Sequence, residues 1–178
     1  MTNITIRRSN TNDANTQTIN RLVSLINQVY DQAEKGMWAI EGGRANAPDI
    51  EDFLKNGKLY LADYEGEIVG SVKIGEVDEH TFEFGMLVAD PDHRNKGIGR
   101  QLVDIVEDHA LNAGYKTIRL ELLTPHEWVN PSKEFLKKWY SRRGYIPNKP
   151  VPFESLYPER KDHFACPCDF TVWLKELT

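Results

Sequence analysis

The chain has 178 residues, of which 40% are hydrophobic and 28% charged, and its formal net charge is -5. This length favours a single domain over residues 1–178, with the composition of an ordinary globular protein. The acidic balance disfavours a general nucleic-acid or anionic-membrane surface, and no apolar run approaches the roughly 20 residues of a membrane span. We therefore expect a cytoplasmic protein with neither nucleic acid nor membrane as a partner.

The hydrophobic pattern alternates between strand and helix periods, and glycine, proline or asparagine marks the element ends. The expected elements are, in chain order, a strand at 4–8, a helix at 18–30, an irregular loop at 36–47, a short helix from Pro48 to Gly57, strands at 59–64, 67–75 and 81–89, a helix at 97–113, a strand at 117–123, a helix from Asn130 to Gly144, an irregular connection at 145–153 and a closing strand at 170–174. This order predicts a mixed α/β (α+β) domain. Its mostly antiparallel sheet is flanked by helices, with a parallel pair where 81–89 crosses over to 117–123.

The two cysteines, Cys166 and Cys168, are separated by one residue, so a disulfide between them would be strained. Together with His163 they resemble part of a zinc site. Structural zinc takes four ligands, however, and no second ligand pair is evident. We expect two reduced thiols and no metal.

The stretch Arg-Asn-Lys-Gly-Ile-Gly at 94–99 lies between a strand and a strongly periodic helix. Amides at a helix start point outward, the helix dipole favours negative charge there, and Gly97 and Gly99 allow close approach to the backbone. The pattern predicts a diphosphate site. A dinucleotide site would need a third glycine and a P-loop would need Gly-Lys-Ser/Thr, and neither is present. A tight turn without a ligand is the remaining alternative.

The element order and two motifs resemble the GNAT superfamily of acyl-CoA-dependent N-acyltransferases. The family signature Leu-x-Val-x-Pro-x-x-Arg-x-x-Gly-x-Gly is matched by residues 87–99, with Ala89 where Val is usual. A second landmark, an aromatic-Tyr pair followed by Gly-aromatic, is matched by Trp-Tyr-Ser-Arg-Arg-Gly-Tyr at 139–145. The resemblance implies an N-acetyltransferase that takes acetyl-CoA as its co-substrate and needs no metal.

The resemblance also implies where acetyl-CoA binds. Backbone groups of Leu87 and Ala89 would bind the pantetheine arm like an added strand, and an amide at Leu87 or Val88 would hold the carbonyl oxygen. Residues 95–100 would hold the pyrophosphate. The implied cofactor-binding residues are Leu87, Val88, Ala89, Arg94, Asn95, Lys96, Gly97, Ile98, Gly99 and Arg100.

Acyl transfer to an amine needs a base for the amine and a proton donor for the departing thiolate. The family position assigns the donor role to Tyr140, although its spacing from Leu136 also suits a core residue. Glu83 and Glu121 both lie where relatives place a base, and we favour Glu83. Strand alternation predicts that Glu83 shares a face with Leu87. Transfer is expected to be direct, in a ternary complex, and not through a cysteine.

In such folds the acceptor site lies near the loop at 36–47 and the segment at 145–168. Its candidate residues are Trp38, Glu41 and Arg44: Glu41 suits a cationic amine and Arg44 a carboxylate, or the two pair with each other. Aromatic residues and prolines in both loops favour a walled pocket and hence a small-molecule amine. The alternatives are a protein or peptide N-acetyltransferase and a non-catalytic acyl-CoA-binding regulatory module. A homodimer is expected by analogy alone.

Overall fold

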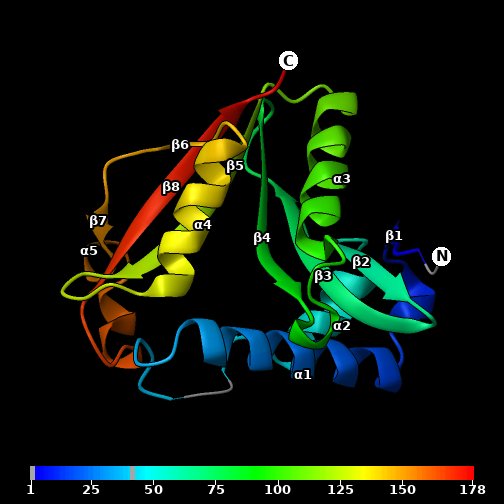
Figure 1. Ribbon diagram of the computed structural model, residues 1–178, viewed down its shortest axis with the longest axis horizontal. Coiled ribbons are helices and arrows are strands. Elements are labelled where there is room, and N and C mark those ends of the chain that lie inside the picture. The colour runs from blue at the N-terminus through cyan, green and yellow to red at the C-terminus, as the bar shows by residue number, and fades with distance from the viewer. Residues whose placement is uncertain (1–2, 41–42) are drawn as a thin grey trace.

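A computed structural model describes residues 3–40 and 43–178 and contains one mixed sheet with helices packed on both faces (Figure 1). The strands are β1 (Thr5–Arg8), β2 (Leu59–Tyr64), β3 (Glu67–Glu76), β4 (Thr81–Ala89), β5 (Thr117–Pro125), β6 (Ile146–Pro147), β7 (Val151–Pro152) and β8 (Cys168–Glu176). The helices are α1 (Thr16–Ala33), α2 (Ala47–Lys55), α3 (Ile98–Asn112), α4 (Pro131–Arg142) and α5 (Phe153–Leu156), with 3₁₀ turns η1 (Thr11–Asp13), η2 (Pro91–His93) and η3 (Pro158–His163). The predicted α/β class and element order are confirmed.

The sheet has the order β1-β2-β3-β4-β5-β8-β6, with β7 paired to β8. Its parallel pair is β4 with β5, as predicted, and this pairing runs only from Thr81–Thr117 to Glu83–Arg119. Beyond that point the two strands diverge, and Figure 1 shows them as the arms of a V with α1 across its open end. The sheet is therefore divided into two halves that are joined only at the start of β4 and β5.

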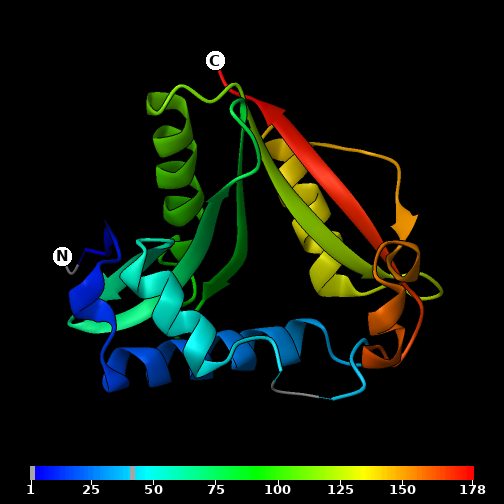
Figure 2. The ribbon, with the colours of Figure 1, turned by 180° about the vertical axis from the view of Figure 1, so that it is seen from behind.

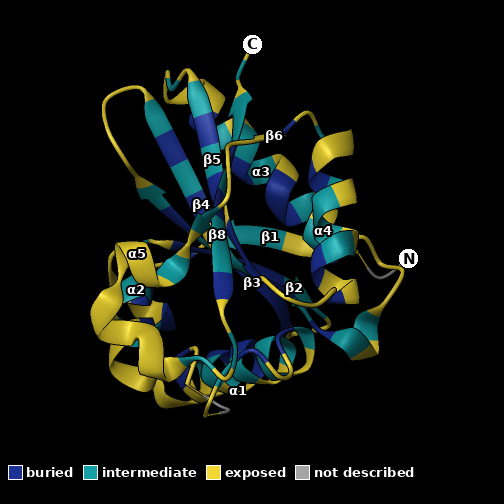
Figure 3. Ribbon diagram, turned by 90° about the vertical axis from the view of Figure 1, so that its left-hand side faces the viewer, coloured by how far each residue is buried: buried dark blue, intermediate teal, exposed yellow. Residues whose placement is uncertain are grey.

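Two hydrophobic clusters hold the helices against the sheet. α3 and α4 pack on one face through residues such as Leu102, Val106 and Tyr140, and α1 and α2 pack on the other through residues such as Leu22 and Ile50. Figure 2 shows α2 on the face opposite α3, and Figure 3 shows buried residues along the strands and the inner sides of the helices. In the described part of the chain, no helix is long and apolar enough to cross a membrane.

Local chemistry explains most of the element boundaries. Asn15, Asn46 and Asn130 each accept a backbone N–H through the side chain at the start of α1, α2 and α4. Glu65 and Gly66 have φ of 52° and 84°, the two positive values of a type I′ hairpin turn. The predicted turn at Glu65-Gly66 and cap at Asn130 are confirmed, whereas α1 begins at Thr16 and α2 at Ala47, slightly earlier than predicted.

The closing strand is longer than its apolar pattern predicts. β8 begins at Cys168 and pairs with β5 along the whole length of that strand, from Pro125–Cys168 to Thr117–Glu176. Strand pairing, a long-range interaction, thus extends β8 past the predicted 170–174. The connection at 145–153, predicted to be irregular, contributes the two-residue strands β6 and β7 to the same partner.

Candidate active site

The divergence of β4 and β5 leaves one edge of β4 without a strand partner. The Asp90 amide donates to the Val69 carbonyl at 2.8 Å, across the Gly70–Ala89 pair of β3 and β4. In an antiparallel ladder this makes Gly70–Ala89 a non-hydrogen-bonded pair, so the N–H and C=O of Ala89 point away from β3. They point into the V, where an extended ligand can bond to them as an added strand does.

A β-bulge interrupts β4 at Met86. The register with β3 shifts between Ser71 and Lys73, and Met86 has a φ of 50°, which non-glycine residues rarely adopt. Because one extra residue changes the alternation, Leu87 packs with the α3-side cluster and not on the face of Glu83. The prediction that Glu83 and Leu87 share a face was wrong for this reason. Methionine carries no bulge signal, so the sequence could not show it.

The glycine turn leaves the start of α3 open. Gly97 is the N-cap residue in the left-handed conformation, with φ 68° and ψ 26°, and no side chain caps the helix there. By contrast, α1, α2 and α4 are each capped by an asparagine. The amides of the first turn of α3 therefore lack the side-chain acceptor that satisfies the other long helices, and the helix dipole favours an anion at this point.

Close packing fixes this helix start against the sheet. A Cβ added to Gly70 would lie 2.6 Å from Ile98 Cγ2 and 2.9 Å from the Val88 carbonyl oxygen. The missing side chain at Gly70 lets α3 dock directly on β3. Because the Ile98 side chain is only 4% exposed, this residue can offer a ligand its backbone amide alone.

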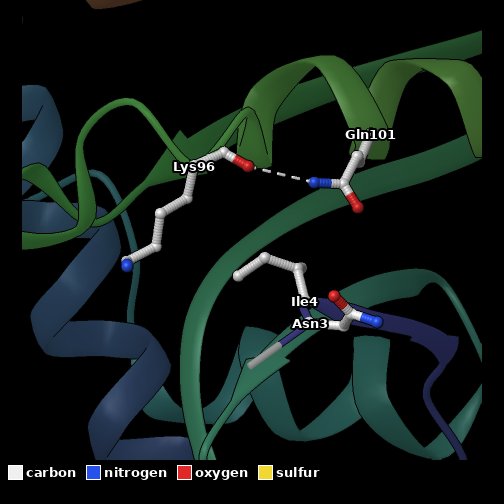
Figure 4. A pocket seen from close by; sticks show the side chains of 4 residues that line it. All are labelled: Asn3, Ile4, Lys96 and Gln101. Carbon is white, nitrogen blue, oxygen red and sulfur yellow. Dashed lines mark hydrogen bonds between the residues drawn. The ribbon is translucent and has the colours of Figure 1, made fainter. Parts of the chain in front are cut away.

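A cavity of about 430 Å³ lies beside the turn and is lined by Asn3, Ile4, Lys96 and Gln101 (Figure 4). The Gln101 side-chain amide donates to the Lys96 carbonyl at 3.1 Å and to the Gly97 carbonyl at 3.4 Å. This side chain therefore satisfies the carbonyls of the turn and leaves the turn amides available to a ligand.

Three exposed basic side chains surround the turn: Arg94, Lys96 and Arg100. The Lys96 ammonium lies 4.5 Å from the centroid of the Tyr64 ring. Within residues 3–40 and 43–178, Arg94 and Arg100 form no ion pair with an acidic side chain. Their charge is thus available to a phosphate in an otherwise acidic protein.

Substitution of Gly99 by alanine should change protein stability and acetyl-CoA affinity in opposite directions. It lies in the first turn of α3, and a Cβ added there would meet no atom within 4 Å. We expect Gly99→Ala to stabilise the free protein by about 0.4–1 kcal/mol, because alanine restricts the unfolded chain. The methyl group would intrude where a diphosphate approaches, so acetyl-CoA affinity should fall roughly tenfold. Thermal unfolding and calorimetric titration measure the two effects, and unchanged affinity would remove Gly99 from the diphosphate site.

Tyr140 lies in α4 on the α3 side of the sheet, packed against Phe84 and Tyr145. It is 4% exposed, and its hydroxyl has no hydrogen-bond partner among the described residues. Burial raises the pKa of Tyr140, and the nearby Tyr30 phenol raises it further. The hydroxyl therefore keeps its proton at physiological pH, as a proton donor must, while the ring is part of the core.

The two candidate bases lie on the other face of the sheet, the face seen in Figure 2. Phe84 of β4 and Leu120 of β5 point into the α3-side core, so the alternating Glu83, Arg119 and Glu121 point the opposite way. Arg119 is paired with Glu83 in the strand register and contacts both carboxylates: its Nε is 3.4 Å from Glu83, and its Nη2 bonds to Glu121. The structure thus brings both candidates together around one guanidinium.

On the predicted acceptor side, Arg44 is held by aromatic rings. Its guanidinium carbon lies 4.4 Å from the Tyr30 ring centroid and 5.9 Å from that of Trp38. Burial lowers the pKa of Arg44, but Tyr30 and the carboxylates of Glu34 and Glu121 outweigh this and raise it. The predicted substrate residue Glu41 lies outside the described residues.

Trp38 contacts both the end of α1 and the segment before β8. Its indole N–H donates to Glu34, and its ring lies 4.4 Å from that of Phe164. Trp38 and Phe164 also form an isolated β-bridge. The loop after α1 therefore meets the segment before β8, the two regions that the sequence predicts to border the acceptor.

A buried ion pair, which no sequence pattern predicts, joins α1 to α4. Lys133 Nζ lies 2.6 Å from Glu34 Oε1, with side-chain exposures of 5% and 1%. Burial lowers the pKa of Lys133, and Glu34 opposes that shift. Asn130 adds a hydrogen bond of 2.8 Å to the Ala33 carbonyl. These contacts fix the end of α1 against the arm of the V that carries α4. The two charged residues are 99 positions apart in the chain, so no local pattern marks them.

The cysteines lie just before β8 and at its first residue. Both are free, and burial raises the pKa of Cys168 to about 12, so its thiol is protonated. Cys166 accepts a hydrogen bond from Trp128 at 3.4 Å and lines a second cavity, of about 440 Å³, with His126 and Asp169. The pKa of His126 is raised by its 2.8 Å contact with Asp169. Across the described ranges, no three His, Cys, Asp or Glu side chains are grouped to hold a metal.

Comparisons with known proteins agree with this geometry. The model of the acetyltransferase (GNAT) family matches residues 23–145. UPF0039 protein C11D3.02c of Schizosaccharomyces pombe is 28% identical over 99 residues, which cover 55% of this chain and 61% of that protein. The match thus spans less than two thirds of that relative.

Two solved structures share the fold. N-acetylglutamate synthase from Neisseria gonorrhoeae, complexed with coenzyme A and N-acetyl-glutamate, superposes with a TM-score of 0.65 at 16% identity, over 98% of this chain and 35% of that chain. A GNAT family acetyltransferase from Elizabethkingia anophelis with acetyl-CoA bound superposes with a TM-score of 0.61 at 22% identity, over 98% and 99% of the two chains.

Proposed function

We propose, from the premise that the chain belongs to the acetyltransferase (GNAT) family of transferases acting on acyl groups, that it acetylates a primary amine of a small molecule with acetyl-CoA as donor. The single observation that carries this proposal is the uncapped start of α3 at Gly97, beside the unpaired edge of β4. Turn amides suit the diphosphate, and the edge at Leu87 and Ala89 suits the pantetheine amides.

The proposed reaction uses both faces of the sheet. Acetyl-CoA supplies an activated thioester, placed in the V between β4 and β5. Glu83, on the acceptor face, takes the proton that the amine loses, directly or through a water molecule. The amide of Leu87 stabilises the negative charge that develops on the carbonyl oxygen, because the Val88 amide faces Ser71 of β3. The N–C bond forms as the C–S bond breaks, and Tyr140, on the opposite face, gives its proton to the departing thiolate.

The small-molecule acceptor is favoured by the aromatic enclosure of the acceptor side. The rings of Tyr30 and Trp38 lie beside the Arg44 guanidinium, and Phe164 packs on Trp38, where the two loops meet. A peptide acceptor would need an open groove. We also propose that the protein acts in the cytoplasm, without nucleic-acid or membrane partners and as a homodimer, and gel filtration with light scattering tests its oligomeric state.

Ligand binding and turnover are tested separately. Acetyl-CoA at a hundredfold excess over its Kd should stabilise the protein by about 2.7 kcal/mol, or roughly 5–10 °C in Tm. A thiol-release assay with a panel of small amines, amino acids and peptides then identifies the acceptor class. If neither acetyl-CoA nor CoA shifted the Tm, the proposed function would be contradicted. A shift without turnover on any acceptor would indicate a binding module, and turnover on peptides alone would indicate a protein N-acetyltransferase.

A further inference from the structure

The contacts of Arg119 with its two carboxylates are unequal. Its Nη2 hydrogen-bonds to Glu121 Oε1, whereas its Nε lies 3.4 Å from Glu83 Oε2. The Nε atom is buried and has no hydrogen-bond partner among the described residues, so the contact with Glu83 is electrostatic only. Glu121 is therefore held directly, and both oxygens of Glu83 remain free to accept a proton.

The carboxylate of Glu83 is accessible on the sheet face. The residue opposite it on β3 is Gly75, where an added Cβ would lie 3.6 Å from Glu83 Oε1. The missing side chain leaves Glu83 room on the sheet face, and its side chain is 38% exposed. Glu83 lies where β4 and β5 begin to diverge, at the closed end of the V, and its exposed carboxylate can meet an amine there while it stays in contact with Arg119.

Among the residues that the structure describes, few other charges face this cluster. On β3, Lys73 turns its ammonium to the Phe53 ring, 4.7 Å from the centroid. On β8, the register partners of Arg119 and Glu121 are the apolar Leu174 and Val172. From the loop after α1, Arg44 acts on Glu121 through space. Within the described chain, Arg119 is the cation in direct contact with both carboxylates.

We infer that Arg119 is a positioning residue that binds Glu121 as its fixed counter-ion and leaves the carboxylate of Glu83 free to act as the base. The inference rests on the proposed function for the role of Glu83 as a base, but the division of charge among the three side chains does not. A nearby cation favours the ionised form of a carboxylate. Glu83 and Glu121 compete for one guanidinium, so changing either partner should shift the ionisation of Glu83 in a definite direction.

The first test needs no substrate. The side-chain carboxyl ¹³C resonance of Glu83, assigned through Glu83→Gln, is titrated by NMR in three variants. We expect Arg119→Gln to raise the titration midpoint of Glu83 by roughly one pH unit, because the cation is lost. Glu121→Gln should lower the midpoint, because Arg119 is then left to Glu83 alone, and Arg119→Lys should stay near wild type. Arg7→Gln, which breaks the ion pairs of Arg7 on β1 with Asp13 of η1 and Asp63 of β2, is the matched control without effect.

Opposite shifts in Arg119→Gln and Glu121→Gln support the inference, and an unmoved midpoint in both overturns it. If Arg119→Gln does not fold, the titration midpoint of Glu83 in Glu121→Gln decides the question. An upward shift or no shift in that variant would contradict the competition of Glu83 and Glu121 for the Arg119 guanidinium. If the contacts of Arg119 were only structural, Arg119→Gln and Glu121→Gln would change Tm but would not move the titration midpoint of Glu83.

The second test follows kcat/KM against pH with the best amine of the panel. Glu83→Gln should remove the acidic limb of the profile, Arg119→Gln should move that limb to higher pH, and Glu121→Gln should keep it and move it lower. An acidic limb that survives in Glu83→Gln and vanishes in Glu121→Gln overturns the assignment of the base. A wild-type protein without any acetyl transfer would contradict the proposed function instead, and the NMR titration would still test the charge division.

Discussion

Tyr140→Phe should lower turnover by roughly 10²–10⁴-fold while acetyl-CoA affinity stays unchanged. The substitution removes only the hydroxyl, which has no partner among the described residues, and leaves the ring in its contacts with Phe84 and Tyr145. Folding should therefore change little, and the loss should fall on the protonation of the departing thiolate. Steady-state kinetics with the best amine acceptor and calorimetric titration with acetyl-CoA separate the two quantities.

The matched control for this variant is Tyr60→Phe. Tyr60 is also a buried tyrosine, but its hydroxyl bonds to His109 Nδ1 at 2.7 Å, between β2 and α3. Loss of that bond should lower stability by about 1 kcal/mol and leave turnover unchanged. If Tyr140→Phe keeps full turnover, Tyr140 is a packing residue and the thiolate takes its proton elsewhere.

Gly97→Val should weaken acetyl-CoA binding by roughly a hundredfold, about 2.8 kcal/mol. The effect is conformational in origin, since the nearest atoms to an added Cβ are 3.8–3.9 Å away and leave room for it. A β-branched residue at φ 68° is a strong outlier, and the left-handed conformation costs an L-residue about 1–2 kcal/mol. The turn must change its backbone, and the amides at the start of α3 then no longer converge on the diphosphate.

Gly114→Val provides the control at the opposite end of the same helix. Gly114 has a φ of 91°, and a Cβ added there would meet no atom within 4 Å, so the backbone strain is similar. Both variants should lose stability, but only Gly97→Val should lose affinity, as measured by calorimetry below the Tm of each variant. Equal affinity in the two variants would show that the turn does not hold the ligand.

The sequence predicts the elements well where local chemistry decides them. The helical spacing of Leu102 and Val106, the turn at Glu65-Gly66 and the cap at Asn130 are each determined by residues near in the chain, and the structure confirms all three. The parallel pair of β4 and β5 follows from the strand–helix–strand order. The glycine turn is likewise visible because only glycine adopts its backbone conformation freely.

Long-range contacts could not be predicted in the same way. The bulge at Met86 depends on register with β3, and it moves Leu87 to the other face of the sheet. The contact of Arg119 with Glu83 depends on pairing of two strands across a helix. The pair Glu34–Lys133 joins two helices that are far apart in the chain. In each case the fold brings together residues that are distant in the chain, and the residue types alone do not show which of them will meet.

The site residues carried over from the family remain predictions, although the geometry gives several of them a physical basis. The positive φ of Gly97, the outward backbone of Ala89 and the unpartnered hydroxyl of Tyr140 are each suited to the assigned role, within the described part of the chain. Arg44 is held by rings, which suits a positioned charge toward the acceptor. They support the proposal that acetyl-CoA binds in the V and that the acceptor amine approaches the sheet face that carries Glu83.

A crystal structure with bound acetyl-CoA would show whether the turn at Gly97 holds the diphosphate. We expect the diphosphate to lie against the amides of residues 97–100 and the pantetheine arm to bond to the backbone of Leu87 and Ala89. The thioester should then lie between Tyr140 and the face that carries Glu83. Acetyl-CoA bound elsewhere, with the turn at Gly97 free of phosphate, would contradict this expectation.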